Sequence, residues 1–283
     1  TLYVGGRSVT GAIDDNRRLA EFIYRNLGYL SRITATLDTH FAFQIFFPSF
    51  WLRADGNPPP AHTVVTSKMV RNGEIRPHPA MAPLFASGNY YWLLEQVAFY
   101  CERLEKGGRY QLYLWPPHCE LGSDGHALAG LIYEAAIFHG FARKAQLELE
   151  VKGTHPLTEN YSIVQPEVLE RFDGKPLAQK NTRFLETMHR ADAIIVAGQA
   201  KSHCVRASSE HLIREIKSQD PSLVKKMYVL EDCMSSVAVP NGSGGFYVDY
   251  TDEADKAFEE FRKDGLQLVR STDPLASWNG LSI

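Results

Sequence analysis

The chain has 283 residues, of which 44% are hydrophobic and 22% charged, the balance of an ordinary soluble globular protein. Its formal net charge of −3 gives no reason to expect nucleic acid or an anionic membrane surface as a partner. No apolar run approaches the roughly 18 to 20 residues of a membrane span. The four scattered cysteines lack CxxC spacing, which argues against disulfides and a structural zinc knot and fits a reducing cytoplasm.

Hydrophobic periodicity and capping signals predict alternating helices and strands. We expect helices at residues 14–27, 90–104, 125–139, 179–190, 203–217 and 254–263. We expect strands at residues 32–37, 110–114, 146–151, 193–197, 227–230 and 266–270. Residues 41–87 are rich in proline and aromatic side chains and have little periodicity, so we expect an excursion over the surface or the mouth of the site there.

Alternation of strands with helices predicts a parallel sheet that is covered on both faces and joined by right-handed crossovers. In such sheets the chemistry lies beyond the carboxyl ends of the strands. Side chains of reactive types follow several of the predicted strands directly, namely Asp38 and His40, His118, Lys152, Cys204 and Asp232. The sequence therefore predicts an active site at this edge of the sheet.

Cys204 is the candidate nucleophile. The apolar strand at 193–197 runs into Gly198, and Ser202 is the expected N-cap of the next helix. The thiol would then lie in the first helical turn, where the helix dipole and free N–H groups favour a thiolate or hold an oxyanion. The alternative is a small buried hydrophobic side chain, which is what most free cysteines are.

Three neighbours bear on this assignment. Lys152, at a strand end, can be the cation that stabilises the thiolate, and the alternative is an exposed loop lysine. His203 adjoins Cys204 in sequence, but consecutive helix residues point about 100° apart, so it is a poor base for that thiol. Cys119 is a rival nucleophile, although it follows no helix start and the two prolines before it suit the aiming of His118.

Asp38, His40 and His118 form a possible metal-binding set, because carboxylate and imidazole ligands suit zinc, iron or manganese. Three ligands would leave positions open for water or substrate. The alternative without a metal is that His40 caps a loop or pairs with Asp38. No GxGxxG or GK[ST] fingerprint occurs, so we expect no nucleotide cofactor. The candidate aromatic walls of a substrate pocket are Phe46, Phe47 and Trp115.

Four segments in register carry a family resemblance. They are Leu37-Asp-Thr-His40, Trp115-Pro-Pro-His-Cys119, Glu150-Val-Lys-Gly153 and Ala197-Gly-Gln-Ala-Lys-Ser-His-Cys-Val-Arg206. Together they resemble the isochorismatase-like cysteine hydrolases, the family of nicotinamidases and related amidases, from about Gly5 to Asp273. The resemblance implies one α/β domain over residues 1–283, with a three-layer α/β/α fold around a mainly parallel, six-stranded sheet.

The same resemblance implies the roles of single residues. Cys204 matches the nucleophile and Lys152 the lysine of a cysteine–lysine–aspartate triad. Ala200 matches the site of a non-proline cis peptide whose N–H joins that of Cys204 in an oxyanion hole. In nicotinamidases, the residues that match Asp38, His40 and His118 bind a metal.

The chain departs from the family pattern at two points. The further histidine that usually follows the Asp-x-His pair is missing from Phe41-Ala-Phe-Gln-Ile-Phe-Phe-Pro48. The family's catalytic aspartate lies on a strand before the first helix, and we see no such strand in this sequence. We therefore expect an aspartate-bearing strand before Thr1, either in upstream residues or supplied by another chain.

We expect an amidohydrolase that cleaves a small, nicotinamide-like carboxamide through a thioester on Cys204. The alternative is a catalytically silent member of the family that acts as a binding or assembly protein. The remaining expectations are one divalent metal, a small-molecule amide as the partner, no nucleic acid, no membrane, a cytoplasmic location and a homo-oligomer, either a dimer or a tetramer.

Overall fold

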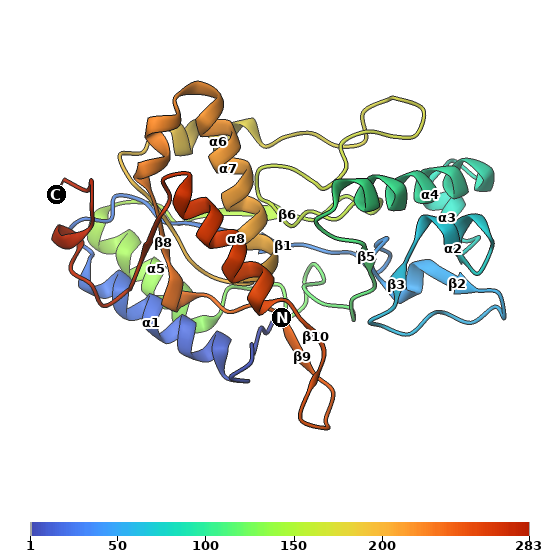
Figure 1. The fold of residues 1–283 in the computed structure, drawn as a ribbon, viewed down its shortest axis with the longest axis horizontal. Coiled ribbons are helices and arrows are strands. Elements are labelled where there is room, and N and C mark those ends of the chain that lie inside the picture. The colour runs from blue at the N-terminus through green and yellow to red at the C-terminus, as the bar shows by residue number, and fades with distance from the viewer. Residues whose placement is uncertain (1, 283) are drawn as a thin grey trace.

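A computed structural model describes residues 2–282 of the chain (Figure 1). The helices are α1 Gly11–Arg25, α2 Ser67–Arg71, α3 Met81–Phe85, α4 Tyr90–Gly107, α5 Gly130–Arg143, α6 Thr182–Arg190, α7 Arg206–Gln219 and α8 Thr251–Lys263. The strands are β1 Thr34–Asp38, β2 Trp51–Arg53, β3 Val64–Val65, β4 Ile75–Pro77, β5 Leu112–Tyr113, β6 Glu148–Lys152, β7 Ile194–Val196, β8 Met227–Leu230, β9 Ala238–Pro240, β10 Phe246–Asp249 and β11 Gln267–Val269. None of the described helices is both long and apolar enough to cross a membrane.

The parallel strands form two short sheets. Strand β1 pairs with β6, and β8 lies between β7 and β11. All four residues of β8 are buried, as expected of a central strand with both faces covered. The mixed α/β class is confirmed, whereas the single six-stranded sheet is not, because no ladder joins the two sheets within residues 2–282.

The prediction for residues 110–114 is wrong in its pairing. Strand β5 pairs antiparallel with β3 and belongs to neither parallel sheet. Its Leu112 is buried in a separate core beneath α4, together with Leu114. A continuous apolar run predicts a buried strand, but it does not reveal which neighbour the strand pairs with.

Residues 41–87 fold into structure of their own, which the lack of periodicity did not predict. They contain α2, α3 and the antiparallel pair β2–β4, and they pack on the long helix α4 at the right of Figure 1. The aromatic side chains of this segment are inside that core, and Phe47, Phe50 and Trp51 have no exposed surface.

The remaining helices cover the parallel strands. Helices α7 and α8 pack together, and their apolar side chains form one core with β7 and β8. Helix α1 packs on α5 and on the turn after β8. This arrangement leaves the carboxyl ends of β1 and β6 directed toward the part of the molecule that contains α4 (Figure 1).

The segment after β7 differs from the expected helix start. Lys201–Val205 is a π-helix, and α7 begins only at Arg206. Ser202 is therefore not an N-cap, because its Oγ accepts a hydrogen bond from the Val237 N–H at 2.9 Å instead. Short π-helical turns occur mostly as insertions in helices and often at functional sites.

Candidate active site

Lys152 lies at the centre of the candidate site. The register of β1 and β6 sets Asp38 opposite Lys152, and the lysine side chain is buried. Its ammonium donates to the carboxylate of Asp38, to the Asn160 carbonyl at 2.9 Å and to the Cys204 Sγ at 3.4 Å. These three acceptors use all three N–H groups of the ammonium, so Lys152 is not an exposed loop lysine.

Cys204 reaches this ammonium through a tightly held turn after β7. Gly198 has a φ of +112°, a conformation that favours glycine, and its N–H donates to the Cys233 carbonyl at 3.0 Å. The Lys201 N–H donates to the Ser235 carbonyl at 2.8 Å. The turn places Cys204 in the π-helix, where it is half-buried and keeps more exposure than the other three cysteines.

The electrostatics of the three groups favour an ion pair beside a neutral thiol. Burial raises the pKa of Cys204 to about 11, although the Lys152 ammonium acts in the opposite direction. The pKa of Lys152 is raised because Asp38 and Cys204 outweigh its burial. The Lys152 charge holds the pKa of Asp38 below its usual value despite its burial. At neutral pH the resting site is therefore a thiol, an ammonium and a carboxylate.

The backbone next to Cys204 offers a donor. The Gln199–Ala200 peptide bond is cis. The Ala200 N–H favours the thiolate form of Cys204 and so opposes part of the rise in pKa that burial causes. The Ala200 carbonyl points the other way and accepts from the N–H groups of His203 and Val205, both at 3.1 Å. An N–H that faces the thiol is suitably placed for an oxygen of a bound carbonyl group.

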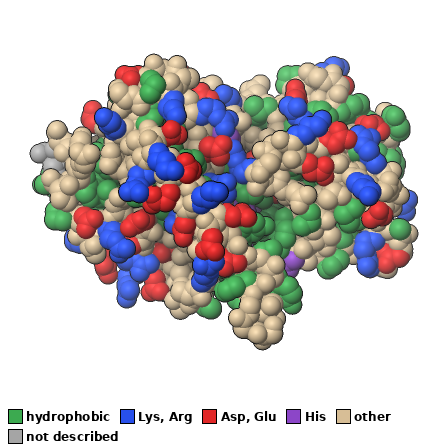
Figure 2. Space-filling model, viewed as in Figure 1, with side chains coloured by type: hydrophobic (Ala, Val, Ile, Leu, Met, Phe, Trp, Pro, Cys, Tyr) green, Lys and Arg blue, Asp and Glu red, His purple; other side chains and the backbone are tan. Residues whose placement is uncertain are grey.

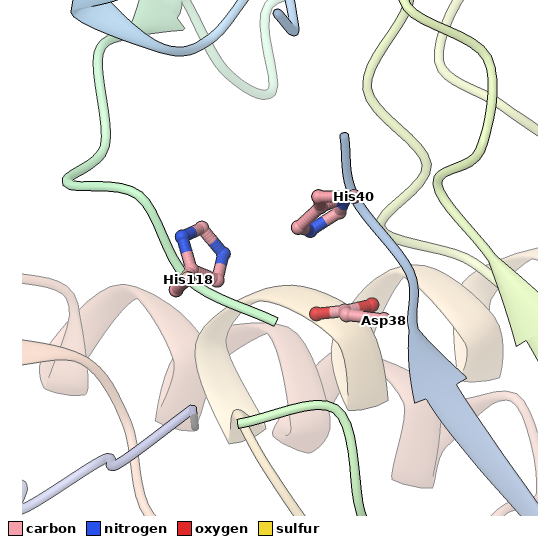
Figure 3. A group of neighbouring side chains, drawn as sticks. All are labelled: Asp38, His40 and His118. Atoms are coloured by element: carbon pink, nitrogen blue, oxygen red, sulfur yellow. The ribbon is translucent and has the colours of Figure 1, made fainter. Parts of the chain in front are cut away.

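Asp38 also belongs to a second cluster. Ligand atoms of Asp38, His40 and His118 lie within 4.8 Å of one another, and Figure 3 shows the three side chains converging on one space. Asp38 and His40 come from the end of β1, and His118 comes from the loop after β5 (Figure 3). The sequence pattern predicted this meeting of three residues.

The two histidines are oriented as metal ligands usually are. His40 Nδ1 lies 3.2 Å from the Gly153 carbonyl, and His118 Nδ1 lies 2.8 Å from the Pro116 carbonyl. A carbonyl only accepts, so each Nδ1 carries the proton and each Nε2 keeps a free lone pair. Burial lowers the pKa of His118 and lowers that of His40 to about 4, which keeps both rings neutral. Two neutral imidazoles and a carboxylate fit a divalent transition metal.

The expected aromatic wall is partly a packing feature. Phe46 and Phe47 are buried and meet the His40 ring edge-on, with centroids 4.9 and 5.9 Å away. Both rings belong to the segment in which the family has a further histidine. Gln44 is fully buried in the same segment and donates to the Gly153 carbonyl at 2.9 Å.

A pocket of about 390 Å³ adjoins the turn that carries Cys204. Trp115, the third residue of the expected wall, is half-buried and lines this pocket. Figure 2 shows a hollow with apolar side chains between α8 and β5. The lining side chains are mainly aromatic: Tyr110, Tyr113, Trp115, Tyr161, His203 and Tyr250, with Val64, Glu105, Arg109, Gln111 and Glu253 around them.

The other candidate residues lie apart from the reacting groups or are inert. His203 is buried among four aromatic rings, and burial lowers its pKa to about 3, so it is neutral. Cys119 is buried, and burial raises the pKa of its thiol. The Asp232 carboxylate accepts from the N–H and Oγ of Ser271, at 2.9 and 2.8 Å.

Sequence reasoning missed the contact between Asp38 and Lys152. The motif suggests Asp38 only as a metal ligand, and it places the acid partner of Lys152 elsewhere. The signal was present in part, since both residues directly follow predicted parallel strands. The missing information was that these two strands are neighbours in register.

No protein-family model and no curated protein matches the sequence. Solved structures do match the fold. The yeast nicotinamidase Pnc1p is 17% identical, with a TM-score of 0.51, and the match covers 92% of this chain and 88% of that one. The same enzyme bound to the inhibitor nicotinaldehyde is also 17% identical, with a TM-score of 0.51, and the match covers 92% of this chain and 89% of that one. The Pyrococcus horikoshii pyrazinamidase in complex with zinc is 15% identical, with a TM-score of 0.45, and the match covers 92% of this chain and 86% of that one. The chain thus has a fold like that of the yeast nicotinamidase.

Proposed function

We propose that the protein is a cysteine amidohydrolase that converts a small, nicotinamide-like carboxamide to its acid and ammonia. The observation that carries this proposal is that the buried ammonium of Lys152 contacts both the Cys204 Sγ and the Asp38 carboxylate. Nucleophile, cation and acid are the groups that thioester chemistry requires. The fold shared with a nicotinamidase supports the choice of an amide as the substrate.

The first half of the reaction forms the thioester. As Sγ of Cys204 attacks the carbonyl carbon, the Lys152 ammonium gives a proton to Asp38 and takes up the thiol proton in the same step. The Ala200 N–H stabilises the developing oxyanion. The proton returns from Asp38 to the leaving nitrogen, the C–N bond breaks and ammonia departs.

The second half regenerates the thiol. Water attacks the thioester, its proton moves through Lys152 and Asp38, and the carboxylic acid leaves as Cys204 is reprotonated. One amide and one water therefore give one acid and one ammonia. The raised pKa of Cys204 means that proton removal accompanies the attack and does not precede it.

Asp38, His40 and His118 would hold a divalent cation next to these groups. When bound, it would supply a Lewis acid that orients a donor atom of the substrate. Since Asp38 also contacts Lys152, the metal and the proton path would share one carboxylate.

Ammonia release from a panel of small carboxamides tests the proposal. We expect the wild-type protein to turn over at least one heteroaromatic carboxamide and the Cys204→Ser variant to turn over none. A protein that releases no ammonia from any member of the panel, with or without added zinc, iron or manganese, would instead be a catalytically silent binding protein.

A further inference from the structure

A side chain of α1 holds the turn that leads to Cys204. Asp15 is only 2% exposed, although it is an acidic residue. Its carboxylate accepts from the Gln199 Nε2 at 2.6 Å and from the Arg18 Nη2 at 2.9 Å. Arg18 is anchored in turn, because its Nε donates to the Asp232 carbonyl after β8. Burial of a carboxylate is costly unless donors face it, so these two contacts account for its place in the interior.

The hydrogen bond to Asp15 determines how the Gln199 side chain lies. A carboxylate only accepts, so the amide NH₂ of Gln199 must face Asp15 and its Oε1 must face away. That Oε1 is buried and has no partner within the described residues. The side chain therefore gains its one hydrogen bond from Asp15.

Gln199 directly precedes Ala200, whose N–H favours the thiolate form of Cys204. The main chain around it is held elsewhere, through the N–H groups of Gly198 and Lys201. Helix α1 approaches the same region closely, since a Cβ on Gly11 would clash with the Ser235 side chain. Within the described residues, the hydrogen bond from the Gln199 side chain to Asp15 joins α1 to the segment between Gly198 and Lys201.

We propose that Asp15 is a positioning residue that holds Gln199, and through it the Ala200 N–H, in register with the Cys204 thiol. The mechanical part of this proposal is independent of any reaction. Its catalytic consequence rests on the proposed amidase function. A displacement of about 1 Å in such a donor can lower a rate by about two orders of magnitude.

Hydrogen exchange tests the mechanical part without an assay of activity. Asp15→Ala should raise the exchange rate of the peptide that covers residues 198–205 about fivefold or more and leave β8 unchanged. Gln199→Met removes the same hydrogen bond from the other side and should give the same result even where Asp15→Ala folds poorly. The matched control is Asp14→Ala, on the more exposed neighbour of Asp15. Unchanged exchange at 198–205 in Gln199→Met would overturn the proposal.

Kinetics then separate positioning from general destabilisation. With an amide that the wild type hydrolyses, Asp15→Ala should lower kcat at least about tenfold and change KM less than about twofold. The double variant with Gln199→Met should be no slower than the slower single variant, because both act through one hydrogen bond. Losses of kcat that add in the double variant would contradict the positioning role. A change in KM alone, with kcat unaffected, would contradict it too. Absence of any amidase activity in the wild type would reject the proposed function and leave the exchange result to decide the role of Asp15.

Discussion

Lys152 shows at the scale of one residue how burial selects chemistry. An ammonium out of water needs a partner charge, and Asp38 supplies it across the register of β1 and β6. Removal of one partner of such a buried pair typically costs about 3–5 kcal/mol. Loss of either partner should therefore destabilise the fold, and the pair also places a cation 3.4 Å from the Cys204 Sγ.

The thiol of Cys204 should react in a way that follows its raised pKa of about 11. Below that pH the thiolate fraction grows about tenfold per unit, so alkylation by iodoacetamide should accelerate from about pH 7 to about pH 10 without levelling off. Cys204 should be labelled before the buried cysteines Cys101, Cys119 and Cys233. Peptide mapping by mass spectrometry measures this order, and earlier labelling of Cys119 would make Cys119 the nucleophile instead.

The nearly isosteric change Cys204→Ser should abolish turnover and leave the thermal midpoint within a few degrees of the wild type. The control is Cys233→Ser, a buried cysteine that has no part in the proposed mechanism. Retention of activity in Cys204→Ser would show that another group attacks the amide.

At the scale of elements, the end of β6 controls the metal cluster. Gly153 has a φ of +83°, and a Cβ there would lie 2.6 Å from the His40 Cε1. Gly153→Ala should displace the His40 ring and weaken zinc binding at least about tenfold. Gly174→Ala is the matched control, because Gly174 has a φ of +77° and nothing lies within 4 Å of the position that a Cβ would take there. Competition with a fluorescent chelator measures the affinity, and equal loss in both variants would attribute the effect to backbone strain alone.

The loop after β6 carries a buried acid that makes stability depend on pH. Glu159 accepts from the hydroxyls of Tyr100 and Tyr161, at 2.9 and 2.5 Å, and burial raises its pKa from 4.5 to about 8. The folded state keeps this proton between about pH 4.5 and 8 while the unfolded state loses it, so the folded state loses stability as pH rises through that window.

Glu159→Gln mimics the protonated acid and should remove this loss. Thermal midpoints of the wild type and the variant should agree near about pH 5, and the variant should melt increasingly higher toward about pH 8. The exposed Glu186→Gln is the control and should follow the wild type. A difference in midpoint that does not change with pH would contradict the assignment.

The elements that sequence predicts best are those with strong local signals. Strand β8, Met227–Leu230, has the predicted bounds because four consecutive residues are apolar and buried. The prediction of Ser202 as an N-cap failed because the Val237 N–H donates to its Oγ. That hydrogen bond joins residues 35 positions apart, which local periodicity cannot reveal.

At the scale of the whole molecule, chain order predicts the site better than it predicts the sheet. Asp38, Lys152 and Cys204 meet because they lie at or beyond the carboxyl ends of parallel strands, as expected of an α/β protein, and His118 joins Asp38 from the loop after the antiparallel β5. The pairing of strands depends on residues far apart in the sequence. It makes β5 antiparallel to β3, and it places Asp38 opposite Lys152. The part of the α4 core that residues 41–87 supply also escaped prediction, since the aromatic side chains of that segment show no regular period.

Hydroxylamine trapping tests the central claim, thioester formation on Cys204, most directly. The experiment adds hydroxylamine to the wild-type protein while it hydrolyses an amide and follows ammonia, acid and hydroxamate together. We expect hydroxamate to form at the expense of the acid while ammonia release is not slowed. The reason is that hydroxylamine attacks the thioester on Cys204 after ammonia has left. Ammonia release with acid as the only other product, at every hydroxylamine concentration, would mean that water attacks the amide directly and would contradict the account.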